Sequence, residues 1–137
     1  MKAECRFEDL EVWRDALELA HDVYRESSRG AFAHDFALRD QIRRAAISVG
    51  SNIAEGFESK TDRLFADYLG RAKASAGEVR AQLHLAGRLG YIEGAALHLL
   101  IFRISSISRQ ISGLIKYLDR CIDRSNASAR KRTGGTA

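Results

Sequence analysis

Glutamate and histidine residues near the start of the sequence have the spacing of a metal site. Glu18 and His21 stand three residues apart, and the Glu-x-x-His spacing supplies ligands to di-iron sites in helical bundles. Such a site needs a second pair of this kind and two further inward-facing glutamates. His34, His84 and His98 have no glutamate three residues before them. We therefore expect neither a bound metal nor another cofactor.

The other candidate catalytic groups have simpler explanations. Glu8, Asp9 and Glu11 stand at a helix start, where carboxylates interact favourably with the helix dipole. The serines from Ser105 to Ser112 lack a histidine at a spacing that would activate them, so we expect them to permit close packing. A phosphate-binding glycine loop, a nucleophile elbow and a zinc signature are all missing. The sequence predicts no enzyme.

The basic residues point to a different kind of partner. Arginine supplies 17 of the 22 cationic residues, and its planar fork pairs with phosphates or carboxylates at fixed geometry. Residues 1–62 carry 9 Lys and Arg against 13 Asp and Glu, whereas residues 63–137 carry 13 against 5. From charge alone, a basic half indicates a solvated face or a contact with the acidic half of another subunit, and nucleic-acid binding is the alternative. The eight candidate phosphate contacts on the helices are Arg71, Lys73, Arg80, Arg103, Arg109, Lys116, Arg120 and Arg124, and the basic run Arg130-Lys131-Arg132 near the end of the chain is a further candidate.

Long helices must position these residues. The chain of 137 residues has no proline, and apolar residues recur at three- and four-residue steps through most of it, which is typical of amphipathic helices. Helices of this kind joined by short loops pack as an up-down-up-down antiparallel four-helix bundle. We therefore expect an all-α fold with a single domain over residues 1–124. The predicted helices span residues 9–28, 34–56, 61–89 and 93–123.

Single residues mark details of these helices. Asp9 and Thr61 are predicted to be helix N-caps. Gly50, inside the second helix, costs about 1 kcal/mol relative to alanine, which a kink or a close contact between helices would explain. A stripe of small residues on the third helix, where another helix could approach closely, consists of Gly70, Ala74, Gly77 and Ala81.

The ends of the chain bear on where the protein works. Residues 125–137 contain the basic run Arg130-Lys131-Arg132 and no large apolar side chain, so we expect a disordered basic tail. Cys5 and Cys121 lie at opposite ends, which excludes a disulfide framework. No apolar run approaches 18 residues and the amino end is charged. We therefore expect neither a membrane span nor a signal peptide, and a cytoplasmic protein.

The segment of residues 41–56 has an unusual composition for a helix. Its serines and asparagine are indifferent helix formers that tend to hydrogen-bond to backbone. If they are buried they must be satisfied, which favours a polar contact that sets the helix register; a ligand or phosphate site is the alternative. Asn52 and Glu55 could bond across the bundle, and Arg43 or Arg44 could pair with a carboxylate. The polar residues in question are Arg43, Arg44, Ser48, Ser51, Asn52 and Glu55.

This segment resembles the signature of the bacterial four-helix bundle proteins related to those encoded in intervening sequences of 23S ribosomal RNA. The resemblance covers about residues 7 to 122. The family often has proline where this chain has Ala33 and Gly50, and a Gly-Ser pair in place of Ala74-Ser75. The matching stretches are Phe7 to Trp13, Gln41 to Ala46, Ser51 to Gly56 and Leu89 to Ile92, with Phe65, Tyr68, Leu69, Ser75, Glu78, Gln82, Leu83 and Ala86 between the last two.

The resemblance implies a homopentamer of four-helix bundles arranged as a ring or barrel, with no catalysis. A related member, the accessory variability determinant of diversity-generating retroelements, forms such a barrel and associates with nucleic acid and reverse transcriptase. The partners that the resemblance implies are therefore further copies of this chain, RNA or DNA, and a protein of the reverse-transcriptase type.

Two functions follow as hypotheses. The leading one is a non-enzymatic, oligomeric accessory protein that binds RNA or DNA through basic helix surfaces. The alternative is a protein-interaction scaffold without a nucleic-acid role, in which the acidic first helix of one subunit faces the basic helices of its neighbour. The acids of that helix are Glu8, Glu11, Asp15, Glu18 and Asp22.

Overall fold

The computed structural model describes residues 6–134, and helices account for almost all of them. Within this range the chain forms no strand, and the predicted all-α class is confirmed. Apart from the end of the last helix, the helix bounds differ by at most two residues from the predicted ranges. The elements are η1 (Phe7–Asp9), α1 (Glu11–Ser27), η2 (Gly30–His34), α2 (Phe36–Phe57), α3 (Asp62–Arg88) and α4 (Gly94–Gly134).

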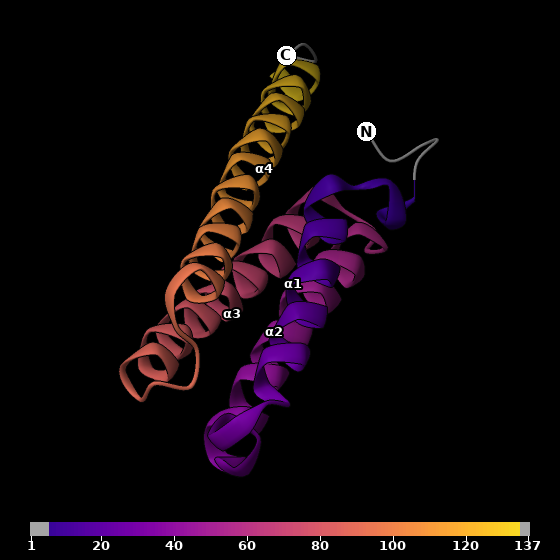
Figure 1. Ribbon diagram of the computed structural model, residues 1–137. Coiled ribbons are helices and arrows are strands. Elements are labelled where there is room, and N and C mark those ends of the chain that lie inside the picture. Colours follow the sequence, from indigo (N-terminus) through magenta and orange to yellow (C-terminus); the bar gives the residue numbers. More distant parts are fainter. Residues whose placement is uncertain (1–5, 135–137) are drawn as a thin grey trace.

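Contacts between helices show the direction in which neighbours run. Asp22 of α1 pairs with Arg103 of α4, whereas the earlier Asp15 accepts a hydrogen bond from the later Gln110. The two helices are therefore antiparallel. Contacts between α1 and α2, α2 and α3, and α3 and α4 follow the same pattern, so the four helices form an up-down-up-down bundle (Figure 1).

The core lies along the shared axis of the bundle, and every helix contributes an apolar stripe to it. The 3-10 helix η2 adds Phe32, whose ring stacks on Tyr91 of the α3–α4 loop at 5.2 Å between centroids. The largest fully buried side chains are Phe32, Phe65, Leu19, Ile42, Ile53, Leu69, Leu83, Ile104, Ile107, Ile111, Leu118 and Val23.

Of the two predicted N-caps, Thr61 and Asp9, only Thr61 caps a helix. Thr61 accepts a hydrogen bond from the backbone N–H of Leu64, as predicted. The predicted cap at Asp9 is wrong: α1 begins after Leu10, and Asp9 instead accepts from the backbone N–H of Arg6. It therefore closes the turn of η1, one residue too early to cap α1.

Asp35 joins two loops at one end of the bundle. Its Oδ1 accepts from the backbone N–H of Leu38 at 3.1 Å and so caps α2. Its Oδ2 accepts from the hydroxyl of Tyr91 at 2.9 Å. This hydrogen bond to the carboxylate raises the pKa of Tyr91 above its ordinary value. One side chain thus holds the α1–α2 connection against the α3–α4 connection.

The expected disordered tail is wrong for most of its length. Residues 125–134 continue α4 without a break, so no domain boundary falls at residue 124. The segment is rich in alanine, arginine and lysine, which are good helix formers, and it contains no proline. Because the packed part of α4 already supplies the helix nucleus, each added residue only has to propagate it. Residues 135–137 lie outside the described part of the chain.

The last turns of α4 project beyond the bundle. Thr61 and Asp62 lie level with Cys121, Ser125 and Asn126 in a shallow pocket, so the other helices end there. All residues from 123 to 134 are exposed, and Figure 1 shows this part of α4 without a neighbouring helix. We call residues 124–134 the helical arm; at 1.5 Å per residue it is about 16 Å long.

Two glycines of α2 meet different surroundings. The helix passes through Gly50 as one element, and a Cβ there would lie 3.7 Å from Trp13 Nε1, an ordinary contact. A Cβ at Gly56 would lie 2.7 Å from Cβ of Tyr68 and 3.3 Å from the backbone oxygen of Phe65. Of these two glycines, only Gly56 is therefore required for the close approach of two helices.

We expect opposite results when the two glycines are changed to alanine. Gly50→Ala should raise the free energy of unfolding by up to about 1 kcal/mol, because it removes the helix penalty of glycine. Gly56→Ala should lower it by about 1–3 kcal/mol, because α3 must move away. Urea unfolding of both variants checks this. Equal effects at the two positions would contradict it.

Candidate nucleic-acid interface

Four of the eight predicted phosphate contacts lie on one face of α4. Arg109, Lys116, Arg120 and Arg124 follow one another at steps of seven, four and four residues, and a helix brings such positions to the same side. Lys131, seven residues further, continues the row. We call these five residues the α4 basic face. Its first and last members, Arg109 and Lys131, lie 22 residues apart, or about 33 Å along the helix.

The α4 basic face is free of carboxylate partners. All five side chains are exposed, and none of them forms an ion pair with another residue of the described range 6–134. The buried residues of α4 lie on the opposite side of the helix, because at 100° per residue their positions are turned by about 180° from the basic face. The face thus points away from the core. The buried residues are Leu100, Ile104, Ile107, Ile111 and Leu118.

The three candidates on α3 do not form one group. Lys73 and Arg80 stand seven residues apart and share an exposed face. Arg71 lies on a different side of the helix, with its guanidinium 4.9 Å from the ring centroid of Tyr68. The structure therefore places Lys73 with Arg80 but separates both from Arg71.

The small-residue stripe on α3 faces outward. All four of its members are exposed, and no other side chain of the described residues lies within 4 Å of a Cβ built at Gly70 or Gly77. The close helix approach expected there does not occur within this chain.

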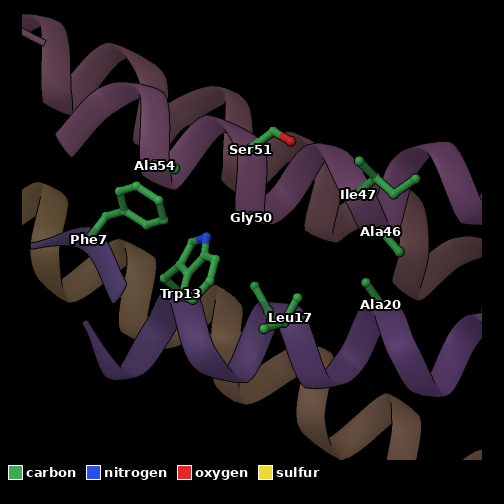
Figure 2. Close-up of a pocket in the computed structure, with 10 residues that line it drawn as sticks. Phe7, Trp13, Leu17, Ala20, Ala46, Ile47, Gly50, Ser51 and Ala54 are labelled. Carbon is green, nitrogen blue, oxygen red and sulfur yellow. The ribbon is translucent and has the colours of Figure 1, made fainter. Parts of the chain in front are cut away.

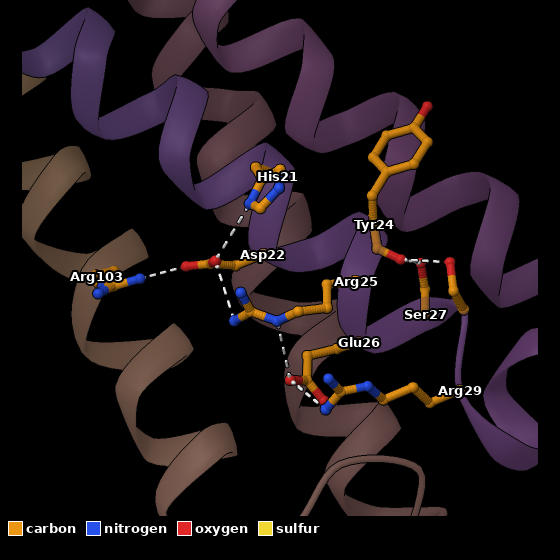
Figure 3. A network of polar contacts seen from close by, with 9 residues as sticks. His21, Asp22, Tyr24, Arg25, Glu26, Ser27, Arg29 and Arg103 are labelled. Carbon is orange, nitrogen blue, oxygen red and sulfur yellow. Dashed lines mark hydrogen bonds and ion pairs between the residues drawn. The ribbon is translucent and has the colours of Figure 1, made fainter.

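Arg103, the eighth candidate, is bound to a carboxylate. Its guanidinium pairs with Asp22, which is 5% exposed although it carries a charge. Arg25 lies 3.1 Å from the same carboxylate, and His21 lies at 3.7 Å (Figure 3). The pair joins α1 to α4. Arg103 is therefore a structural residue that links two helices, and it is not a free cation like the residues of the α4 basic face.

Replacing Arg103 tests this structural role. Arg103→Ala leaves the buried carboxylate of Asp22 with Arg25 as its remaining close cation, so the free energy of unfolding should fall by about 1–3 kcal/mol. Arg109→Ala, on the α4 basic face, should change it by less than about 0.5 kcal/mol. Thermal and urea unfolding measure both variants. Equal stability of the two would contradict the assignment.

Arg43 and Asn52 of the signature segment bond within the chain. Arg43 donates to the hydroxyls of Ser27 at 2.8 Å and Ser28 at 3.0 Å, rather than to a carboxylate. It thereby holds the end of α1 against α2. Asn52 donates to the backbone oxygen and hydroxyl of Ser48, one turn earlier.

Ser48 links α2 to α3. Its hydroxyl forms a hydrogen bond of 2.9 Å with the buried hydroxyl of Ser75. A polar contact between α2 and α3 is therefore present, but Ser48 makes it. The expected bonds of Asn52 and Glu55 across the bundle are not formed, because Asn52 bonds within α2 and Glu55 is exposed. Arg44, Ser51 and Glu55 are exposed and make no side-chain hydrogen bond or ion pair within the described residues.

An apolar groove runs between α1 and α2 beside these exposed signature residues. It has a volume of about 320 Å³ and is almost entirely apolar in its lining. Figure 2 shows Phe7 and Trp13 reaching from η1 and α1 toward Ala54 and Gly50 on α2. Leu17 and Ile47, further along the groove, are 52% and 47% exposed. We call this surface the α1–α2 groove.

The metal and catalytic candidates remain apart. Glu18 and His21 are both exposed, and the described residues contain no group of three His, Cys, Asp or Glu side chains that could hold a metal ion. Cys5 lies outside the described range, and Cys121 is half-buried. A contact with Cys121 raises the pKa of Tyr117. In residues 6–134 no helix has the length and apolar character that crossing a membrane requires.

Fold and surface together define a class: a small all-α protein of four helices with an outward-facing basic helix surface. A family model described as "23S rRNA-intervening sequence protein" matches residues 8–113, and the chain belongs to this family. The resemblance seen in the sequence is thus confirmed. No curated protein matches the chain.

A solved structure from Bacteroides thetaiotaomicron has a similar fold. It is described as a protein with unknown function from the S23 ribosomal protein family. The two chains are 25% identical, with a TM-score of 0.70 over 77% of this chain and 98% of the other. The match therefore takes in nearly the whole of that protein, and the family assignment and the fold agree.

Proposed function

We propose that this protein is a non-enzymatic, oligomeric accessory protein that binds RNA or DNA through the α4 basic face. The observation that carries the proposal is the row of five exposed cations, without carboxylate partners in residues 6–134. Cations that find no partner within a protein attract phosphates strongly, because binding releases the counterions condensed on the nucleic acid. The exposed pair Lys73 and Arg80 on α3 adds to the same positive potential.

The family supports a nucleic-acid setting. Its name refers to an intervening sequence of 23S ribosomal RNA, and the related structure is assigned to a ribosomal protein family. An accessory protein of this kind needs no active site. Its work is to hold a nucleic acid, and a protein partner of the reverse-transcriptase type is the one that the resemblance suggests.

The oligomer is proposed as a homopentameric ring, following the same resemblance. The α1–α2 groove supports it, because a solvated apolar groove of this kind marks an interaction surface. Further large apolar side chains are exposed on other helices, away from the groove. Contacts between unlike surfaces of identical chains form a ring when the rotation from one copy to the next closes. These further residues are Leu64, Leu85, Leu89, Leu99 and Phe102.

Fluorescence anisotropy with a structured RNA and a duplex DNA, at salt concentrations rising from 50 mM, tests the proposal. Five phosphate contacts predict that log K falls with log salt with a slope of up to about −4 to −5 on B-form DNA. Absence of binding to either nucleic acid at 50 mM salt would refute the proposed function.

The second candidate is a protein-interaction scaffold, and the α1–α2 groove is the observation that favours it. The charge-pairing version of this hypothesis loses two of its five acids, because Asp22 pairs with Arg103 and Asp15 accepts from Gln110 in the same chain. An assembly held by the groove keeps its mass as salt rises, whereas one held by charge pairs dissociates. Sedimentation at low and high salt separates the two.

A further inference from the structure

We infer that the helical arm, residues 124–134, binds in the major groove of B-form duplex DNA. The inference rests on the proposed nucleic-acid function and specifies the form of its ligand. Every residue of the arm is exposed, and the arm stands beyond the end of the other three helices (Figure 1). It can therefore enter a groove that the bundle itself is too wide to enter.

The dimensions of the arm suit this groove. An α-helix with its side chains is about 10–12 Å across, and the major groove of B-form DNA is about 12 Å wide and 8.5 Å deep. Between its cations the arm carries mainly small residues, so its backbone can come close to the base edges. These small residues are Ser125, Ala127, Ser128 and Ala129.

The arrangement of the cations differs between the bundle and the arm. Along the packed part of α4 the cations form one row, which can face one phosphate strand. On the arm, Arg130 and Arg132 flank Lys131, and each is turned by about 100° from it to opposite sides. A helix in a groove has a phosphate strand on both sides, and this arrangement matches it.

The side of the arm between Arg130 and Arg132 faces the floor of the groove. Arg124 and Lys131 stand seven residues apart and lie between the two flanking arginines. Arginine and lysine are the side chains that most often donate to the O6 and N7 acceptors of guanine in the major groove. No acid lies in residues 124–134 to oppose them.

Other nucleic-acid forms fit the arm less well. Proteins that bind single strands stack aromatic side chains on the bases, and no aromatic residue follows Tyr117 in the chain. The major groove of A-form RNA is too deep and narrow for side chains to read. An exposed basic helix without aromatic residues therefore favours the B-form duplex.

The variant Ala129→Pro tests the inference without changing a charge. Proline inside a helix removes a backbone hydrogen bond and clashes with the carbonyl four residues earlier, so the arm loses its helical form while its cations remain. Ala129→Ser at the same position is the matched control. Both variants should unfold at the temperature of the parent chain, because Ala129 is exposed and contacts no other helix.

The binding of a DNA duplex of about 20 base pairs, two helical turns, is compared with that of a single strand of the same length. Ala129→Pro should weaken duplex binding at least about tenfold at 100 mM salt, the effect of losing one or more phosphate contacts. It should leave single-strand binding near that of Ala129→Ser. If Ala129→Pro and Ala129→Ser bind the duplex equally, the helical form of the arm is irrelevant and the inference is wrong. The α4 basic face can still bind nucleic acid in that case.

Two further outcomes have distinct meanings. If polyglutamate competes with the duplex as well as unlabelled DNA does, the arm recognises charge alone, and the inference is also wrong. If the parent chain binds no nucleic acid at 50 mM salt, the proposed function fails first, and the arm has no duplex to enter.

Discussion

Changing Lys116 and Arg120 together to glutamate should weaken binding to RNA and to duplex DNA at least about a hundredfold at 100 mM salt. Each lost phosphate contact removes nearly tenfold at this salt, and the new carboxylates repel phosphate. The salt slope on duplex DNA should become shallower by about 2. The two residues are neighbouring members of the α4 basic face and are exposed, so the fold should tolerate the change.

The matched control is Arg14→Glu with Arg44→Glu. Both arginines are exposed, lie on α1 and α2, and form no ion pair within residues 6–134. The change in net charge equals that of the α4 double variant. If the control weakens binding as strongly, net charge governs the interaction and the α4 basic face is not the site.

Leu17→Asp in the α1–α2 groove should convert the proposed oligomer into monomers. Burying a carboxylate in an apolar contact without a partner costs several kcal/mol, which exceeds what one side chain contributes to a typical interface. The monomer itself should unfold normally, because Leu17 is already 52% exposed. Sedimentation velocity gives the mass and circular dichroism the fold.

Leu64→Asp serves as the control for this variant. Leu64 is 44% exposed and lies in the first turn of α3, outside the groove, where a carboxylate interacts favourably with the helix dipole. The proposed oligomer should persist in this variant. If Leu17→Asp also keeps the mass of the parent, the groove does not join subunits.

The helices could be predicted because their evidence is local. Each signal depends on residues within about one helical turn of one another. The signals are the apolar residues at three- and four-residue steps, the Thr61 cap and the glycines at the helix ends. Composition alone mispredicts the tail, because it does not show that the segment is continuous with a packed helix. A segment without apolar residues cannot start a helix, but it can extend one that the bundle has already formed.

The partners of individual charges could not be predicted from sequence. Arg103 looked like the other cations, and Asp22 looked like part of an acidic surface. The signal that was missed is the position of Asp22 three residues after Leu19 and next to Val23, both buried in the core. A carboxylate on the buried side of a helix requires a cation nearby, and Arg103 supplies it.

The row of cations on α4, by contrast, was present in the spacing of the candidates. Steps of seven and four residues between Arg109 and Arg124 place them on one face of any helix. The structure adds that this face is opposite the core, and that Lys131 belongs to it. The signature segment divides similarly: Arg43 and Asn52 make internal bonds, whereas Arg44, Ser51 and Glu55 remain exposed.

The unbroken course of α4 from Gly94 to Gly134 gives any ring of this protein two different sides. Because the arm shares one helix with the packed core, the bundle sets the direction in which it leaves. Rotation about a single ring axis repeats that direction in every copy. All arms of a cyclic assembly therefore emerge on the same side. The α1–α2 loop that Asp35 fastens lies at the other end of each subunit, so such a ring would have a polarity, and the proposed nucleic-acid contact through the arms would fall on one of its sides.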